Sequence, residues 1–463
     1  MPSLSQLIPR HSALNTDFYQ LTMAAGYFAQ SLHTQRASFE LYVRRLPHQR
    51  QFLVAAGLEQ ALEHLENLRF EAYEIAWLRQ QDVFNQVPAA FWDYLKGLRF
   101  TGDVWALPEG TVFFPYEPLL RISAPLIEAQ LVETWLLSLL NYQTSVASKA
   151  ARISLVLQKY GRGHFVDFGS RRTHGPEASL LAARAAWIGG ATGTSNVSAA
   201  RSLNIPVVGT AAHAWTMAFA SEREAFGAYH QAFPEHTTLL VDTYDTLQGV
   251  RNAIATTSAL RGIRLDSGDF LSLSQQARQL LDQAGLQQTK IIASGDLNEY
   301  KTEALLKAGA PIDSFGIGTE LVTSIDAPSL GGVYKLVEIS SEGHKRYPCK
   351  LSSGKTAYPG CKQIWRQTDA DGRFGSDLLG LHSETQDGQP LLQAFMQNGQ
   401  RVQALPTLPE IQHYCQSQLQ SLPETLQCLD PAPPYSVSLS QDLQDLYAQV
   451  RLQYTATEET SHV

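Results

Sequence analysis

A regular alternation of short apolar segments and amphipathic segments, from residue 164 to about 338, constrains the fold more than any other feature. A short apolar segment that ends in small or polar residues and precedes an amphipathic run is typical of a βα unit. The predicted strands are 165–169, 191–195, 206–210, 238–242, 262–266, 290–294 and 313–317, with 333–338 as a candidate further strand. The predicted helices between them are 176–188, 197–203, 216–231, 246–258, 270–283 and 298–308.

The order of these units predicts an α/β fold. Strictly alternating βα units imply right-handed crossovers and an all-parallel sheet. Six or more units in succession favour a parallel (β/α) barrel, complete or irregular, over an open sheet. A doubly wound sheet remains an alternative, because a sequence does not show whether a sheet closes.

The flanking segments lack this regularity, so the chain is expected to contain more than one domain. Single cores stop growing near ~250–300 residues, and this chain has 463. The predicted division is an N-terminal α+β domain at 1–145, an α/β domain at 146–339 and a C-terminal segment at 340–463. The N-terminal part is expected to contain helices at 18–28, 53–68 and 128–157 and a strand at 37–44. On its own segment, Tyr19 is interpreted as a packing aromatic.

Charge and hydropathy exclude several classes of protein. The net charge is −8, which argues against a broad nucleic-acid surface, since such a surface needs a basic excess. The N-terminus has no apolar core of signal-peptide length, and the apolar run Leu131–Leu140 is too short to span a membrane and contains Glu133. A cytoplasmic protein without a membrane partner is therefore expected.

The four cysteines are far apart in the sequence and form neither a CxxC pair nor a zinc-binding spacing. Free thiols in a reducing compartment are the expected state of these residues.

Polar residues follow every predicted strand of the α/β region. The seven segments are GSRRTHG, TSN, GTAAHAW, VDTYDT, GIRLDSGD, IIASGDLNE and GIGTE. Because ligands bind at the carboxyl ends of parallel strands, these segments predict one ligand-binding face. The first three segments contribute a basic, hydroxyl-rich set suited to a phosphate-bearing anion: Arg171, Arg172, His174, Ser195, Asn196, Thr210 and His213.

Two glycine-rich turns, Ser294–Glu299 and Gly316–Glu320, are candidates for holding phosphate through backbone N–H groups and a hydroxyl. Neither turn matches a Walker loop or GxGxxG, so each is a weak signal when taken singly. Asp266, Asp269 and Asp296 lie beside these turns, where carboxylates bind sugar hydroxyls or Mg²⁺.

The basic residues of this face have several open roles. Arg171 and Arg264 suit two-point pairing with a carboxylate or phosphate. His213 follows a strand end closely. Three roles are open for it: general acid or base, nucleophile, or hydrogen-bonded core histidine.

The chain resembles the nicotinate phosphoribosyltransferases, from its N-terminus to about residue 366. A single motif would be weak evidence, but the motifs occur in the order of that family: NTDFYQLTM, FELYVRRLP, DFGSRR, GTAAHAW, GIRLDSGD, SGDLNE, GIGTELVTS, SLGGVYKLVE and KLSSGKTAYPGCKQIWR.

This resemblance implies transfer of phosphoribosyl from 5-phosphoribosyl 1-pyrophosphate to nicotinate, coupled to ATP hydrolysis, in NAD salvage. It also implies an irregular barrel joined to a domain built from N- and C-terminal segments, and a homodimer with shared active sites. Mg²⁺ is the implied cofactor, acting on pyrophosphate; no residue is singled out as its ligand.

The resemblance also assigns roles to residues of this sequence. His213 matches the histidine that ATP phosphorylates, and Tyr19 matches an aromatic that stacks on nicotinate across the dimer interface. Asp266 and Asp296 match carboxylates near the ribose. The positions around the nicotinate carboxylate and the phosphoribosyl group are Arg171, Thr210 and Arg264, and the phosphate turns contain Ser294, Gly295, Gly318 and Thr319.

Two alternatives remain open, and a third is argued against by the position of a lysine. A nicotinamide phosphoribosyltransferase shares the fold and several of the motifs, and a non-catalytic relative would bind a sugar phosphate as a sensor. A barrel lyase or aldolase would need a lysine at a strand end, whereas Lys290 lies at a strand start.

Overall fold

The computed structural model describes residues 13–350 and 357–460, and the chain divides into two compact units. The first unit comprises residues 1–145, 329–426 and 430–463, and the second comprises 146–328 and 427–429. The first unit is thus built from segments at both ends of the sequence. Residues 351–356, which belong to the last of the family-like motifs, lie outside the described residues.

The second unit contains a five-stranded sheet in the order β6-β10-β9-β8-β7. Every ladder between neighbouring strands is parallel, which confirms the predicted parallel sheet. Bridges from Asp167 to Thr194 and from Thr194 to Val207 extend the pairing beyond β6. The strands are β6 (His164–Asp167), β7 (Thr238–Leu240), β8 (Gly262–Leu265), β9 (Lys290–Gly295) and β10 (Ser314–Ile317).

The predicted strands 191–195 and 206–210 are wrong as regular strands, because each takes part in bridges through one residue alone, Thr194 or Val207. Pro206 has no N–H to donate to a ladder, and a Cβ at Gly193 would lie 2.8 Å from the Pro206 carbonyl oxygen. The two segments therefore pair only around Thr194 and Val207 and do not form a longer ladder. The candidate strand 333–338 lies within β11 (Gly332–Ser341), in the antiparallel sheet of the first unit.

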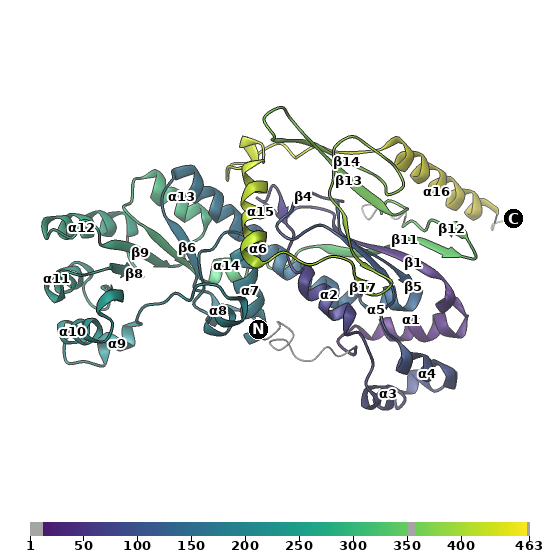
Figure 1. Cartoon of the computed structure of the whole chain (residues 1–463), viewed down its shortest axis with the longest axis horizontal. Coiled ribbons are helices and arrows are strands. Elements are labelled where there is room, and N and C mark those ends of the chain that lie inside the picture. The colour runs from purple at the N-terminus through teal and green to yellow at the C-terminus, as the bar shows by residue number, and fades with distance from the viewer. Residues whose placement is uncertain (1–12, 351–356, 461–463) are drawn as a thin grey trace. The chain divides into compact units, whose positions relative to one another are not determined.

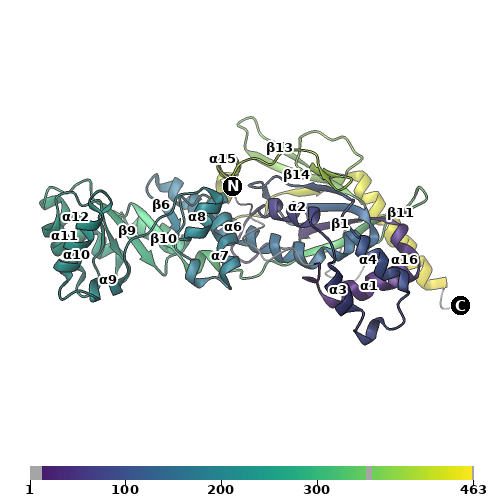
Figure 2. The ribbon, with the colours of Figure 1, turned by 60° about the horizontal axis from the view of Figure 1, so that its bottom comes forward.

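Most predicted helices of the second unit are present. They are α7 (Pro176–Ile188), α8 (Val197–Leu203), α11 (Thr246–Thr256), α12 (Phe270–Gln283) and α13 (Glu299–Lys307). Helices α10 (Glu222–Ala232), α11 and α12 lie side by side, and α11 and α12 pack against β8 and β9 (Figure 1, Figure 2). The single helix predicted at 216–231 is wrong: α9 (His213–Met217) ends before α10 (Glu222–Ala232) begins. Ser221 explains the break, because its side chain accepts a hydrogen bond from Glu224 N and caps α10.

Four helices of the second unit begin with a side-chain cap directly after a strand-end segment. Asn196, Asp245, Asp269 and Asn298 accept backbone N–H groups at the starts of α8, α11, α12 and α13. These caps fix where each segment ends, and so fix the short loops between them.

A cavity of about 880 Å³ is lined by residues of all five parallel strands and by the segment around Val207. Its lining includes His164, Thr238, Gly262, Ile292 and Ser314.

The first unit contains a seven-stranded sheet in the order β12-β11-β1-β5-β3-β16-β17. Its ladders are antiparallel. The strands are β1 (Arg36–Val43), β3 (Asp103–Ala106), β5 (Pro118–Pro125), β11, β12 (His344–Arg346), β16 (Gln393–Gln397) and β17 (Gln400–Arg401). A second sheet joins β15 (Gln389–Pro390), β13 (Lys362–Thr368), β14 (Phe374–Leu381) and β18 (Val437–Leu439), and a small pair joins β2 (Leu53–Val54) to β4 (Val112–Phe113).

The helices of the first unit are α1 (Phe18–Ala29), α2 (Leu58–Glu66), α3 (Ala72–Leu78), α4 (Ala89–Gly97), α5 (Leu126–Leu131), α15 (Leu408–Gln420) and α16 (Gln441–Thr460). The short helix α14 (Thr319–Val322) belongs to the second unit. The helix predicted at 53–68 is wrong at its start, where β2 occupies Leu53–Val54 and Gly57, at φ +105°, precedes α2. The helix predicted at 128–157 is divided between α5 and α6 (Glu133–Tyr160).

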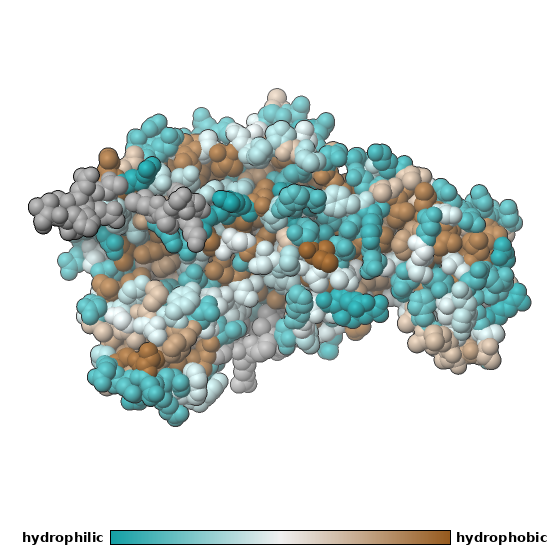
Figure 3. Space-filling view, turned by 180° about the vertical axis from the view of Figure 1, so that it is seen from behind, coloured by the Kyte–Doolittle hydropathy of each residue, from teal (hydrophilic) through white to brown (hydrophobic). Residues whose placement is uncertain are grey.

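Figure 3 shows hydrophobic and hydrophilic residues intermingled on the face that is visible from behind. Within the described ranges, none of the helices is long and apolar enough to cross a membrane. All four cysteines are free, as predicted.

Candidate active site

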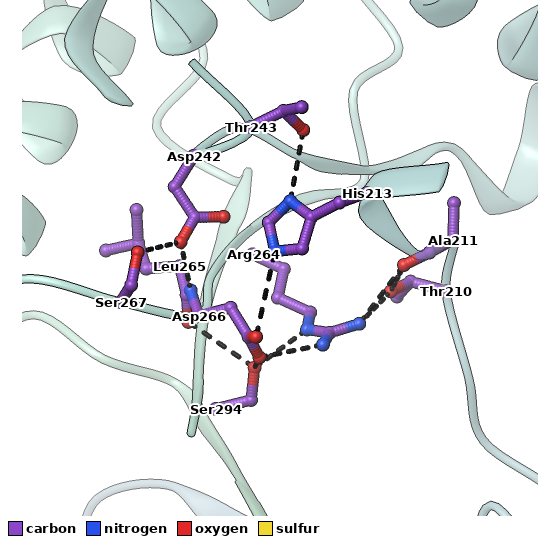
Figure 4. Close-up of polar contacts among 10 residues, drawn as sticks. All are labelled: Thr210, Ala211, His213, Asp242, Thr243, Arg264, Leu265, Asp266, Ser267 and Ser294. Atoms are coloured by element: carbon purple, nitrogen blue, oxygen red, sulfur yellow. Dashed lines mark hydrogen bonds and ion pairs between the residues drawn. The ribbon is translucent and has the colours of Figure 1, made fainter. Parts of the chain in front are cut away.

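His213 is the first residue of the short helix α9, directly after the third strand-end segment. Its Nδ1 lies 3.2 Å from the Thr243 hydroxyl, and its Nε2 lies 3.8 Å from Oδ2 of Asp266 (Figure 4). The imidazole is 40% exposed. It is therefore oriented on one side and open to a ligand, unlike a buried core histidine.

Arg264 on β8 connects three strand-end segments. Its Nε donates to the Ser294 hydroxyl at 2.7 Å, and Nη1 donates to the Thr210 hydroxyl at 2.9 Å (Figure 4). Its Nη2 donates to Oδ1 of Asp266 at 2.8 Å, and the guanidinium carbon lies 5.6 Å from the centre of the Phe168 ring. These contacts, with a further bond from Nη1 to the Ala211 carbonyl oxygen at 3.2 Å, fix the planar guanidinium at the edge of the sheet, where its positive charge attracts an anion.

Asp266 is held as a carboxylate. Burial raises its pKa, but hydrogen bonds from Ser294 and Arg264, and the positive charge of Arg264, outweigh burial and leave the pKa below its ordinary value. The ionised form thus carries negative charge at the centre of the strand-end face at neutral pH.

A second carboxylate positions the segment around Asp266. Asp242 accepts the Asp266 backbone N–H at 2.9 Å and the Ser267 hydroxyl at 2.7 Å through the same oxygen, Oδ2. Its Oδ1 is buried and has no hydrogen-bond partner among the residues that the structure describes.

Gly295 and Gly318 belong to tight turns at the ends of β9 and β10. Gly295 has φ +120°, and a Cβ there would lie 2.7 Å from the Asp266 carbonyl oxygen. A Cβ at Gly318 would lie 3.1 Å from the Phe168 carbonyl oxygen, and Thr319 begins α14 directly afterwards. The missing side chains let the end of β9 approach that of β8, and the end of β10 approach that of β6, closely.

Asp167 joins the first two strand-end segments. It is buried, and it accepts Gly169 N at 2.8 Å and the Thr194 hydroxyl at 2.7 Å. Burial raises its pKa, and this effect is larger than that of the two hydrogen bonds, which lower the pKa. This carboxyl group organises the loops and is covered by them.

The structure therefore brings five of the predicted residues into one connected set: Thr210, His213, Arg264, Asp266 and Ser294. Arg171 and Asp296 are exposed, and neither side chain makes a polar contact among the described residues. Tyr19 lies on α1 in the first unit and is 48% exposed. Asp269, a candidate for sugar or metal binding, caps α12 through Leu271 N and Ser272 N.

The sequence reasoning did not assign roles to Asp242, Thr243 or Lys149. The first two lie in the predicted strand-end segment VDTYDT, so their position was the available signal. Lys149 is a lone lysine in an apolar helical run. It is 1% exposed, and its Nζ lies 3.0 Å from Glu299, 2.9 Å from Asp326 and 3.7 Å from Glu320. It thereby joins α6 to the segments that follow both glycine-rich turns.

Among the described residues, no group of three or more histidine, cysteine, aspartate or glutamate side chains is arranged to hold a metal ion. The site can bind anions through Arg264, stabilise positive charge through Asp266 and offer a nucleophilic imidazole at His213.

A parallel sheet with these groups at its carboxyl edge defines a class: an α/β enzyme that acts on an anionic, phosphate-bearing substrate. Three family profiles match the chain. They are the nicotinate phosphoribosyltransferase N-terminal domain at residues 14–141, the nicotinate phosphoribosyltransferase family at 163–349 and the nicotinate phosphoribosyltransferase C-terminal domain at 385–447. The chain belongs to the nicotinate phosphoribosyltransferase family.

Two curated relatives are similar over nearly their whole length. A nicotinate phosphoribosyltransferase of Mycobacterium tuberculosis is 45% identical over 452 residues, which cover 96% of this chain and 95% of the relative. A nicotinate phosphoribosyltransferase of Bacillus subtilis is 39% identical, with 93% of each chain covered. The crystal structure of human nicotinic acid phosphoribosyltransferase superposes with a TM-score of 0.82 at 30% identity, covering 94% of this chain and 99% of the human chain.

Proposed function

We propose that this chain transfers phosphoribosyl from 5-phosphoribosyl 1-pyrophosphate to the ring nitrogen of nicotinate, forming nicotinate mononucleotide and pyrophosphate. The reaction belongs to NAD biosynthesis. The observation that carries the proposal is the set of contacts in which Arg264 binds Thr210, Ser294 and Asp266 beside His213.

The chemistry of glycosyl transfer suits this arrangement. Departure of pyrophosphate from the anomeric carbon develops positive charge on the ribose ring, as in other glycosyl transfers. Asp266, fixed as an anion by Arg264 and Ser294, stabilises that charge. The nicotinate ring nitrogen already has a free electron pair, so the step needs no general base.

Arg264 and the two glycine turns bind the anions of the substrates in this proposal. The guanidinium is nearly buried, with 13% of the side chain exposed. Solvent therefore screens its attraction for a carboxylate or phosphate only weakly. Ser294, Gly295, Gly318 and Thr319 would hold phosphate, and Arg171 and Asp296 are exposed side chains free to reach the substrate.

We propose that His213 couples ATP hydrolysis to this reaction as a phosphohistidine. Thr243 occupies Nδ1, which leaves Nε2 as the nucleophile. Its bond to the γ-phosphorus forms as the bond to the ADP oxygen breaks, and water later takes the phosphoryl group to give inorganic phosphate.

Mg²⁺ fits the site as an ion carried with pyrophosphate. The unpartnered Oδ1 of Asp242 and the exposed carboxylate of Asp296 are the oxygen atoms that would hold it, directly or through water. When bound, the ion makes pyrophosphate a better leaving group.

The parallel sheet is proposed to be an irregular (β/α) barrel. Support comes from the cavity of about 880 Å³, which residues of all five strands and of the Val207 segment line together. A crystal structure in which the 206–210 segment lies far from β7 would contradict closure.

Tyr19 is proposed to complete the site of a second copy in a homodimer. Its ring is 48% exposed, beside Phe18 at 50% and Met23 at 38%, so this face of α1 has apolar side chains open to a partner. Tyr19→Ala and Asp266→Asn, each inactive alone, should recover about a quarter of wild-type activity when mixed and reassociated, because one site in each mixed dimer is intact. No recovery in mixtures shown to exchange subunits would mean that Tyr19 acts within its own chain.

The nicotinamide alternative is tested by the choice of base. With 5-phosphoribosyl 1-pyrophosphate and Mg²⁺, the product should be nicotinate mononucleotide, measured by chromatography, with little product from nicotinamide. Preference for nicotinamide would overturn the assignment of the substrate, and no product from either base would favour a non-catalytic sugar-phosphate-binding protein.

A further inference from the structure

The first unit contains a cavity of about 340 Å³ that shares no lining residue with the candidate active site. It lies over the face of the seven-stranded sheet formed by β1, β3 and β5 and is also lined from β11, β12 and the end of β14. We call it the Arg121 pocket, after the residue that decides its chemistry. Its principal side chains are Arg36, Trp105, Arg121, Ser123, Lys345 and His382.

Arg121 is a buried cation without a carboxylate partner. Its side chain lies on β5, and the residue is only 2% exposed. Nη1 donates to the Lys362 carbonyl oxygen at 2.7 Å, whereas Nε is buried with no hydrogen-bond partner in the described ranges. None of the described carboxylates forms an ion pair with it. Burying a charge costs free energy unless it is paired, so this guanidinium favours an anion from outside the chain.

The other two cations of the Arg121 pocket are already neutralised. Arg36 pairs with Asp103 at 2.5 Å, and Lys345 pairs with Glu338 at 3.1 Å. The charge that remains uncompensated is therefore the one on Arg121.

Neutral groups around Arg121 add hydrogen-bonding capacity and an apolar wall. The guanidinium carbon lies 5.3 Å from the centre of the Trp105 ring, and His382 meets the same ring edge-on at 4.4 Å. Nδ1 of His382 is buried without a partner among the described residues, and the Ser123 hydroxyl lies 2.8 Å from that of Ser38. Burial and the charge of Arg121 lower the pKa of His382 to about 4, so the imidazole is neutral at pH 7 and adds no positive charge.

We propose that the Arg121 pocket binds a small organic anion whose phosphate or carboxylate group pairs with Arg121. A cavity of about 340 Å³ is at the lower end of the usual range for small-molecule sites, ~300–1,000 Å³. The anionic group accepts from the guanidinium and from the serine hydroxyls, and the rest of the molecule lies against Trp105.

Hydrogen–deuterium exchange of the full-length protein tests the proposal, because it shows which segments an anion protects. It therefore distinguishes the Arg121 pocket from the candidate active site, which is also proposed to bind anions. Inorganic phosphate and acetate, titrated separately, distinguish a phosphate site from a carboxylate site. Protection is expected in β5 and around His382 in the wild type. Arg121→Met should weaken the apparent affinity by about tenfold or more, since it removes a charged hydrogen bond. Protection around Ser294 should be the same in Arg121→Met as in the wild type.

Lys345→Gln serves as a second variant, because Lys345 is 56% exposed and its loss leaves the fold intact if Arg121→Met does not fold. It should weaken the affinity by a smaller factor. Absence of protection at β5 with both anions would overturn the proposal, and so would protection that persists unchanged in the variants. Either result leaves the proposed phosphoribosyl transfer untouched.

Discussion

Nε2 of His213 lies 3.8 Å from Oδ2 of Asp266, although the two residues follow different predicted strands and are separated by more than fifty positions. The same carboxyl group accepts from Arg264 at 2.8 Å. One carboxylate thus contacts both the residue proposed to receive the ATP phosphoryl group and the residue proposed to bind the substrate anion. Energy coupling and phosphoribosyl transfer are expected to be linked through it.

Arg264→Lys should lower kcat/KM for nicotinate by ~100-fold or more. Lysine retains the charge but cannot contact Thr210, Ser294 and Asp266 together in the planar arrangement that arginine makes. Steady-state kinetics at fixed, saturating 5-phosphoribosyl 1-pyrophosphate measure the effect. Arg251→Lys, on an exposed position of α11, is the matched control and should behave as the wild type.

Asp266→Asn should destabilise the protein at neutral pH, and this destabilisation should disappear in acid. The pKa of Asp266 is lowered in the folded state, so its ionised form contributes stability above the unfolded pKa of about 3.9. That contribution is lost as pH falls through the lower folded pKa. Urea unfolding of both proteins should give a constant difference between pH 7 and pH 5 that narrows below about pH 4. A difference that grows in acid would contradict the lowered pKa.

Thr243→Val should slow phosphorylation of His213 by about tenfold, because it removes the hydroxyl beside Nδ1 that orients the imidazole. Incorporation of the γ-phosphoryl group of ATP into the protein, measured over time, reports the effect. Thr243→Ser keeps the hydroxyl and should retain most of the rate. Equal rates in the two variants would show that this contact does not position the imidazole.

Lys149→Met should destabilise the protein by about 3 kcal/mol, since it removes the cation shared by the buried Glu299 and the half-buried Glu320 and Asp326. Arg152, 3.2 Å from Glu299, still pairs with that carboxylate. Urea unfolding measures the loss. Lys159→Met, on the same helix, is the matched control. Its pair with Glu303 at 2.8 Å is 41% exposed at the lysine, so a loss of only about 0–1 kcal/mol is expected. Similar losses in both variants would mean that the buried cluster contributes no more than a surface pair.

The regular part of the fold was predictable from the sequence because each βα unit carries its own signals. Helix α8 begins at the cap Asn196 and α7 at Pro176, and both have the predicted bounds. The segment around Thr194 and Val207 was not predictable in detail. Its apolar residues indicate strands, whereas Pro206 and the close approach at Gly193 limit the pairing to single bridges.

The candidate site was predictable where chemistry coincides with a strand end. Arg264, Asp266 and Ser294 were found in this way, and the structure connects them directly. The strand-end position of Asp242 was a signal, but its partners Asp266 and Ser267 are distant in the sequence. Lys149 lies in a helix, and nothing local to it indicated its contact with Glu299. The unpaired charge of Arg121 is likewise a property of the packed sheet.

The most direct test of the central claim is the initial rate of pyrophosphate release from 5-phosphoribosyl 1-pyrophosphate, with nicotinate and Mg²⁺, in the presence and absence of ATP. Wild type is compared with His213→Ala and with His174→Ala, an exposed histidine of the first strand-end segment. Nicotinate-dependent release, stimulated by ATP in the wild type and His174→Ala but not in His213→Ala, is the predicted result. Equal stimulation in His213→Ala would contradict the phosphohistidine role, and absence of nicotinate-dependent release would contradict the proposed function itself.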